Sequence, residues 1–468
     1  MTKAAGQGAH RGRQTEAIPQ VTVKDRTRAG KALRDKVPRT AQAKWETWTG
    51  RRDAVEQIRA ATRGLLAELL PIRYVRMRAS PFAFFRGSAA MMAGDLAHTP
   101  VTGLRVQACG DCHLANFGGF GSPERRLLFD INDFDETLPA PWEWDVKRFA
   151  ASVVLAGRER GLRERECGEA AKLGAQSYRT HMRRYARMRA IEVWYSHLNA
   201  SVLIRRAHSA AGKKRWETAE NKAKRQTAEH VLPSITEVVR GRRRIVDRPP
   251  MVYHPRQTQK YEREVRDIFR GYRLTLPEER RVILDRYRVA DVARKVVGVG
   301  SVGTRCDVML LMAGLDDPLL LQFKEARESV LEPYAGKSRY RNHGERAVTG
   351  QRLLQAASDV FLGWTRDDHG RDYYFRQLRD MKMSVELGAL SKDDWTEYVA
   401  ICAWTLARAH ARTGDPAQIA GYLGKSDRFD EAIAEFAVAY ADQTERDYEV
   451  FVKGIRAGRL HAASSSRA

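Results

Sequence analysis

The sequence predicts an α+β fold with two lobes, one rich in helices and one built around a small antiparallel sheet. Apolar residues recur at helical spacing through residues 141–204 and again through 393–412. Residues 292–325 differ, because two apolar runs, CDVMLLM and LLLQFKEA, flank a turn at residues 315–318. A chain of 468 residues is also long enough for more than one lobe.

Further elements follow in chain order. Apolar residues at helical spacing predict a helix over residues 53–70, which Pro71 should end. Residues 345–361 predict another helix, and the segment DYYFRQLRD predicts a strand between that helix and the one at 393–412.

These patterns divide the chain into five segments. Residues 1–44 are polar and basic and lack periodic apolar positions, which is typical of disordered tails. The remaining boundaries follow the change from helical to strand patterns and back. We predict a disordered basic tail at 1–44, a helix-rich lobe at 45–290, a β-rich nucleotide-binding lobe at 291–385, helices completing the helical lobe at 386–458, and a disordered tail at 459–468.

The bulk properties indicate a cytoplasmic protein. No apolar run approaches the roughly 20 residues that a membrane span needs. The first residues are basic and polar without the apolar core of a secretory signal, and five cysteines do not suggest a disulfide framework. The net charge of +24 would attract polyanions. The basic residues are widely dispersed, however, and no zinc-finger or helix-turn-helix pattern is visible, so nucleic acid is a possible but not favoured partner.

The segment CGDCHLANFG at 109–118 contains the strongest candidates for chemistry. Asp111 and Asn116 have the D-x-x-x-x-N spacing of a protein-kinase catalytic loop, in which the Asp orients the acceptor hydroxyl and the Asn binds metal. An apolar strand follows and delivers Asp133, then Phe134, much like the metal-binding D-F-G element of kinases. Oxygen ligands of this kind suit Mg²⁺.

Two alternatives share these residues. Cys109 to His113 match the C-x-x-C-H pattern of covalent haem attachment, but that chemistry requires export and no signal for it is visible. A zinc site formed by Cys109, Cys112 and His113 would be crowded and lacks a second ligand pair at a suitable spacing.

A glycine-rich segment lies downstream. Gly298, Gly300 and Gly303 form G-x-G-x-x-G, and Ser301 lies between the second and third glycines. Two strands follow rather than a helix, which is the setting of a kinase phosphate-covering loop and not of a dinucleotide fold. Lys324 ends the second of these strands, where kinases place a phosphate-contacting lysine. Such a lysine pairs with a glutamate on the next helix, and Glu345 is our candidate, with Glu325, Glu328 and Gln351 as alternatives.

The order of these motifs is inverted relative to ordinary kinases. The catalytic loop and metal-binding Asp come first, at 109–135, and the glycine-rich loop, Lys324 and the long helix follow at 298–412. Cutting the usual order between the long helix and the catalytic loop reproduces this arrangement. The sequence therefore predicts a circularly permuted, protein-kinase-like fold that uses ATP and Mg²⁺.

GDCHLANFG, INDFDE and WEWDVKRFAAS resemble the aminoglycoside and choline phosphotransferase branch of the kinase-like superfamily. That resemblance implies that Asp111 is the catalytic Asp, that Asn116 and Asp133 bind Mg²⁺, that His113 orients the loop and that Asp145 supports it. Residues 45–455 also resemble a bacterial family catalogued as domain of unknown function 2252. The matching stretches include SPFAFFRG, CGDCHLANFG, FDINDFDET, PWEWDVKR and GVGSVGTR.

The function expected from these features is ATP- and Mg²⁺-dependent phosphoryl transfer to a small-molecule acceptor. Transfer of a nucleotidyl (AMP) group from the same pocket is one alternative, and a basic nucleic-acid-binding protein with a degenerate nucleotide pocket is another. Arg78 and Arg86, just upstream of the catalytic loop, are candidates for binding phosphate or an acidic substrate. The acceptor and the oligomeric state stay open.

Overall fold

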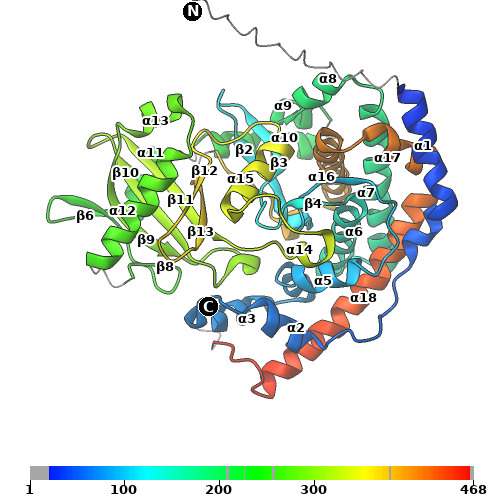
Figure 1. The fold of residues 1–468 in the computed structure, drawn as a ribbon, viewed down its shortest axis with the longest axis horizontal. Coiled ribbons are helices and arrows are strands. Elements are labelled where there is room, and N and C mark those ends of the chain that lie inside the picture. Colours follow the sequence, from blue (N-terminus) through cyan, green and yellow to red (C-terminus); the bar gives the residue numbers. More distant parts are fainter. Residues whose placement is uncertain (1–20, 207–209, 226, 256–258, 379–380, 464–468) are drawn as a thin grey trace, which may run out of the picture.

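The computed structural model describes residues 21–206, 210–225, 227–255, 259–378 and 381–463. These residues form a mixed α+β structure with antiparallel sheets, in which a helical part and a sheet part lie side by side (Figure 1). The helical part comprises the described residues from 21 to 225 and from 386 to 463. The sheet part comprises those from 228 to 377, so it is inserted within the helical part. None of the described helices is both long enough and apolar enough to cross a membrane.

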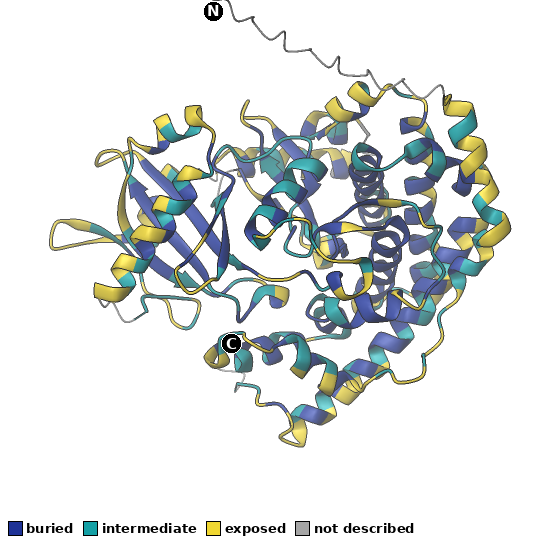
Figure 2. Cartoon of the chain, viewed as in Figure 1, coloured by how far each residue is buried: buried dark blue, intermediate teal, exposed yellow. Residues whose placement is uncertain are grey.

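Four long helices form the centre of the helical part: α6 (Trp142–Glu159), α7 (Glu164–Tyr185), α16 (Lys392–Thr413) and α18 (Arg428–Arg456). Helices α6 and α16 are buried along most of their length, and Figure 2 shows both in dark blue. Both contribute many residues to the largest apolar cluster among the described residues. Ser391 is the N-cap of α16, because its side chain accepts a hydrogen bond from the backbone N–H of Asp394.

The N-terminal segment is ordered from residue 21, which corrects the prediction of a disordered tail over 1–44. Helix α1 (Val23–Lys36) begins with a capping box between Thr22 and Asp25. It packs against α17 (Pro416–Leu423) so closely that a Cβ at Gly30 would lie 1.9 Å from the carbonyl oxygen of Gln418. The predicted tail at 459–468 is ordered through residue 463, with Leu460 buried. Sequence periodicity missed α1 because it contains few apolar residues and its contact surface includes a glycine. Residues 1–20 and 464–468 lie outside the described residues.

The sheet part contains a six-stranded antiparallel sheet in the order β12-β13-β11-β10-β9-β8. Strands β10 (Cys306–Met312) and β11 (Pro318–Ala326) form the predicted hairpin, with Cys306 opposite Lys324. Strand β9 (Arg288–Lys295) pairs with β10, and β13 (Asp372–Gln377) pairs with β11. The edge strands are β8 (Val252–Tyr253) and β12 (Gly363–Arg366).

Both faces of this sheet are covered. Alternate residues such as Met309 and Leu321 pack under α12 (Gln259–Leu274), and the residues between them face α11 (Ala228–Ile235) and α15 (His343–Leu354). This alternation follows from the two-residue period of a strand. Because α11, β8 and α12 belong to the sheet part, the sheet part begins well before the predicted boundary at 291. The basic residues around 240–244 conceal these elements in the sequence.

Two smaller sheets position the segment that carries Asp111. Strand β1 (Arg105–Ala108) pairs with β4 (Leu138–Pro141). Strands β14 (Met383–Ser384), β2 (Phe117–Gly121), β3 (Leu127–Ile131) and β5 (Leu198–Asn199) form the second sheet in that order. Strand β14 belongs to the segment that returns from the sheet part to α16, so this connection is attached beside the candidate site.

The predicted helix at 53–70 ends much earlier, since α2 (Ala54–Ala61) is followed only by a short 3-10 helix at Ala67–Leu69. Pro71 lies in the first turn of the next helix, α3 (Leu70–Met77), instead of ending a helix. The predicted helix at 345–361 ends earlier, at Leu354. The other helices are α4 (Pro81–Arg86), α5 (Ala89–Leu96), α8 (Ala190–Tyr195), α9 (Ala200–Arg206), α10 (Ala210–Lys224), α13 (Glu278–Leu284) and α14 (Glu332–Ala335), and β6 (Thr236–Val239) and β7 (Arg242–Ile245) form an exposed hairpin.

Candidate functional site

A cavity of about 610 Å³ lies between the helical part and the sheet part. This volume is within the range of small-molecule and cofactor sites. Most of the residues predicted from sequence line it, although they come from segments far apart in the chain. They are Asp111, His113, Asn116, Asp133, Gly298, Gly300, Ser301 and Lys324. Gly303 and Glu345 are not part of its lining.

Asp145 of α6 holds the loop that carries Asp111 through hydrogen bonds. The Asp145 carboxylate accepts hydrogen bonds from the backbone N–H groups of Cys109 (2.7 Å) and Gly110 (3.0 Å). It also contacts Nε2 of His410 at 3.1 Å, and Nδ1 of the same ring lies 2.8 Å from the Tyr178 hydroxyl. The loop is therefore supported by α6, α7 and α16 together, as the resemblance implied for Asp145.

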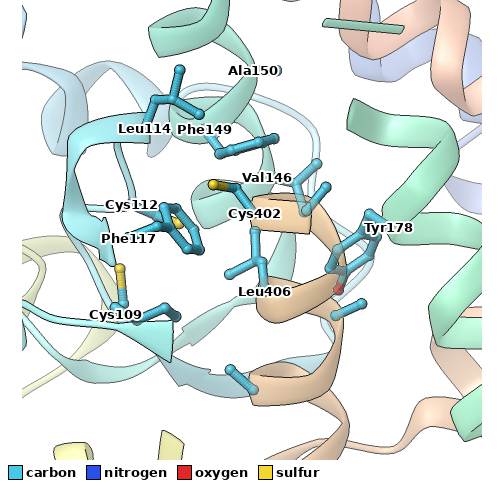
Figure 3. Packing of buried hydrophobic residues seen from close by; sticks show 14 of the residues in the cluster. Cys109, Cys112, Leu114, Phe117, Val146, Phe149, Ala150, Tyr178, Cys402 and Leu406 are labelled. Atoms are coloured by element: carbon cyan, nitrogen blue, oxygen red, sulfur yellow. The ribbon is translucent and has the colours of Figure 1, made fainter. Parts of the chain in front are cut away.

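Apolar packing holds the other side of this loop. Cys109 and Cys112 point into the core, where Cys112 and Phe117 lie beside Phe149 of α6 and residues of α16 (Figure 3). Gly110 has φ of 82°, and a Cβ there would lie 2.3 Å from the carbonyl oxygen of Glu136. Only glycine fits this position without moving the backbone.

The two carboxylate oxygens of Asp111 have different surroundings. Oδ1 accepts a hydrogen bond from Nε of Arg148 at 2.7 Å. Oδ2 lies 3.9 Å from Nε2 of His113 and 3.9 Å from where a Cβ of Gly300 would be. Burial raises the pKa of Asp111, but the charge of Arg148 outweighs this and keeps the pKa below its usual value. Burial lowers the pKa of His113 to about 3, so this imidazole is neutral at physiological pH. Asp111 is thus ionised, with one oxygen held and the other facing the cavity.

Asn116 and Asp133 offer oxygens suited to a divalent cation. The side-chain amide of Asn116 donates from Nδ2 to the backbone oxygen of Asp111 at 2.7 Å, so its Oδ1 is the atom left for a ligand. Asp133 accepts from the backbone N–H of Asp135 through Oδ1 at 3.2 Å. Burial and the nearby charge of Asp135 raise the pKa of Asp133. A cation placed there would relieve the repulsion between these two carboxylates.

Lys324 pairs with Asp135, not with Glu345, which corrects the predicted partner. The Lys324 ammonium group contacts Oδ2 of Asp135 and donates to Oγ of Ser301 at 2.6 Å. The Tyr374 hydroxyl donates to the other oxygen of Asp135 at 2.7 Å. Glu345 instead lies in the first turn of α15, where its backbone N–H is capped by Asn342. Burial opposes charge on Lys324, but the carboxylate of Asp135 raises the lysine pKa above its usual value.

The glycine-rich loop connects β9 and β10 and is held against the helical part. Buried Arg73 donates to the carbonyl oxygens of Gly300 (2.8 Å) and Val302 (3.1 Å). The backbone N–H of Leu66 donates to the carbonyl oxygen of Gly303 at 2.8 Å. Gly303 has φ of +102°, and its role is therefore to turn the chain rather than to line the cavity.

Sequence reasoning missed several residues of the cavity. Asp135 was visible as the last residue of D-F-D, in the position where kinases have glycine, and this departure was its only signal. Arg376 follows from strand alternation, since Tyr374 and Arg376 share the β13 face that carries Lys324 on β11. Gln322 follows from the same alternation, because it lies two residues before Lys324 on β11. Gln351 was considered only as a partner of Lys324. Further lining residues had no local signal and are brought in by tertiary packing, among them Glu136, Lys295, Gln355 and Lys382.

The only group of three potential metal ligands found among the described residues lies beneath the loop. Ligand atoms of Cys109, Cys112 and Asp145 all lie within 4.8 Å of one another. The Asp145 carboxylate is already used by two backbone N–H groups, and burial raises the pKa of both thiols. These contacts indicate that the three residues support the loop structurally and do not form a metal site.

Comparison with known proteins gives a family but no characterised relative. No curated protein and no solved structure matches the chain significantly. A family model described as "Uncharacterized protein conserved in bacteria (DUF2252)" matches residues 63–454, a range that includes the whole cavity. The chain therefore belongs to this bacterial family, DUF2252.

Proposed function

We propose that the chain is an ATP- and Mg²⁺-dependent phosphotransferase with a circularly permuted, protein-kinase-like fold. The observation that carries this proposal is that one cavity is lined by Asp111, Asn116 and Asp133 from the first half of the chain and by Gly300 and Lys324 from the second. These two groups of residues are far apart in sequence. A circularly permuted kinase-like fold requires that they meet in one cavity.

The topology of the sheet part supports this proposal. The glycine-rich loop joins the first two strands of the run β9-β10-β11, and Lys324 lies on the third. Protein kinases place their glycine-rich loop and lysine in the same relation. Helix α15 follows the third strand, then β12 and β13, and the return segment at 381–391 leads into the long helix α16.

Asp111 would act on the acceptor. Its Oδ2 faces the cavity, so a bound hydroxyl group could donate its proton to this oxygen as the acceptor oxygen attacks phosphorus. Arg148 keeps the carboxylate ionised and fixes its orientation through Oδ1. Burial lowers the pKa of His113 to about 3, which makes it a poor base, and we assign it the loop-orienting role that the resemblance implies.

Asn116 Oδ1 and the Asp133 carboxylate would hold Mg²⁺, and their oxygen chemistry fits that ion. When bound, the ion would neutralise negative charge on the phosphates of ATP. Lys324, held by Asp135, would contact phosphate oxygens beneath the glycine-rich loop. Catalysis would come mainly from positioning and charge neutralisation.

Thermal unfolding with and without Mg-ATP tests this function. Ligand at about a hundred times its Kd should stabilise the wild-type chain by roughly 2.7 kcal/mol. Asp133→Ala should lose this shift, and Asp316→Ala should keep it, because Asp316 is exposed in the β10–β11 turn outside the cavity. No shift for the wild-type chain would contradict a nucleotide site. A shift that persists in Asp133→Ala would place the metal elsewhere. The mass of the product then separates phosphoryl transfer from AMP transfer.

A further inference from the structure

Arg86, at the end of α4, lies where the two halves of the site meet. It lines the cavity together with Asp111 and Gly300. A Cβ at Gly300 would lie 3.1 Å from the carbonyl oxygen of Arg86 and 3.9 Å from Oδ2 of Asp111. The tip of the glycine-rich loop, the free oxygen of Asp111 and Arg86 are therefore neighbours in one corner of the cavity.

The charge of Arg86 has no carboxylate partner in the described part of the chain. No ion pair within 4.0 Å involves this residue, and its Nε is buried without a hydrogen-bond partner there. Its guanidinium lies 5.9 Å from the centre of the Phe82 ring. Burial lowers the pKa of Arg86, which reflects the cost of keeping this cation away from water.

Other arginines around the site use their terminal nitrogens for hydrogen bonds, although Nε of Arg73 and Nε of Arg346 also lack partners among the described residues. Arg148 is bonded to Asp111 and to the carbonyl oxygen of Phe85, and Arg73 is bonded to three carbonyl oxygens. Arg346 donates to the carbonyl oxygens of Thr137 and Asp135. Arg86 differs from them in facing the cavity with donors to spare. A guanidinium in this state is suited to an oxyanion, which it can contact through two parallel hydrogen bonds.

We propose that Arg86 binds the phosphoryl group in transit from ATP to the acceptor and offsets the charge that develops on it; this inference rests on the proposed function. In the step, a bond forms between the acceptor oxygen and the γ-phosphorus, and the bond from that phosphorus to the β–γ bridging oxygen breaks. The bridging oxygen keeps the electron pair and leaves as part of ADP. The acceptor proton passes to Oδ2 of Asp111. Arg86 and the backbone of the glycine-rich loop contact the equatorial oxygens. An arginine supplied within the same chain does this in some nucleotide hydrolases.

The test uses the whole chain with MgADP, alone and with aluminium fluoride, which mimics the phosphoryl group in transit. Wild-type protein should gain further thermal stability from fluoroaluminate. Arg86→Ala should bind MgADP within threefold of wild type but bind the fluoroaluminate complex at least tenfold more weakly. Its kcat for ATP turnover should fall by about a hundredfold or more with KM for ATP nearly unchanged. Arg86→Lys keeps the positive charge but cannot form two parallel hydrogen bonds to one oxyanion, so its loss of fluoroaluminate binding should be intermediate.

Arg78→Ala is the matched control, because Arg78, the other arginine predicted to bind phosphate, lies at the end of α3 and does not line the cavity. It should behave as wild type in every measurement. Normal fluoroaluminate binding by Arg86→Ala would overturn the role of Arg86. The role of Arg86 would also be overturned if Arg86→Ala weakened the binding of MgADP as much as that of the fluoroaluminate complex. The same holds if fluoroaluminate gave the wild-type chain no further stability. If wild-type protein binds neither MgADP nor MgATP, the proposed function itself fails. Should Arg86→Ala not fold, Arg86→Lys and Arg86→Gln carry the same comparison.

Discussion

Lys324 and Asp135 form a buried ion pair across 189 positions of sequence, and the side chains are only 4% and 24% exposed. The pair joins strand β11 of the sheet part to the segment that carries Asp133. Removal of one partner leaves the other charge buried without compensation, which is the costly case for ion pairs.

Lys324→Met should therefore lower the free energy of unfolding by about 3 kcal/mol, because Asp135 would lose its cation. The double variant Lys324→Met/Asp135→Asn should lose less than the sum of the two single variants. Urea denaturation of the four proteins measures this coupling. Additive losses would show that the pair contributes no interaction of its own.

Glu345→Ala should have little effect, in contrast to an ordinary kinase. Its carboxylate has no contact with Lys324, and its place in the first turn of α15 contributes only about 0.3–1 kcal/mol through the helix dipole. Thermal stabilisation by Mg-ATP should match that of the wild-type chain, whereas Lys324→Met should lose it. A Glu345→Ala variant that no longer responds to nucleotide would show that this glutamate joins the site after binding.

Asp145→Asn should loosen the loop that carries Asp111. The carboxylate accepts two backbone hydrogen bonds, and an amide can accept these less well and carries no charge. We expect a loss of about 2–3 kcal/mol in the free energy of unfolding. Hydrogen exchange at the amides of Cys109 and Gly110 should also become faster. Asp393→Asn, at an exposed position in the first turn of α16, is the control and should change stability by less than about 0.5 kcal/mol. Unchanged exchange at both amides would contradict this support role.

Glu136 should make stability depend on pH. Burial raises its pKa from 4.5 to about 7, although the charge of Arg346 opposes this. Between these two values the folded chain holds a proton that the unfolded chain has lost, so this group's contribution to stability falls as pH rises from 4.5 to 7 and is constant above. Glu136→Gln should remove that slope. Its melting temperature relative to wild type should therefore be higher at pH 8 than at pH 5. An equal difference at both pH values would contradict the raised pKa.

The sequence predicted the parts of this protein that depend on short-range patterns. The strand pair around 306–326, helix α16 and the candidate site residues at 111–133 all have local spacing rules. The structure brings the predicted site residues into one cavity except for Gly303 and Glu345. Helix α1 and the partner of Lys324 were not predictable in this way. The first depends on a close backbone approach at Gly30, and the second on which of several acidic residues the fold brings to the lysine.

Because the sheet part is inserted within the helical part, the two parts cannot be completed in the order of synthesis. The strands of the six-stranded sheet all lie between residues 252 and 377, so the sheet can form once that stretch has left the ribosome. Helix α1 must wait much longer, since Arg34 bonds to the carbonyl oxygen of Tyr422, 388 positions later. At roughly 5–20 residues per second this delay is about 20–80 s. During that time the nascent chain presents the unpaired faces of its first helices, and only the arrival of α17 and α18 covers them.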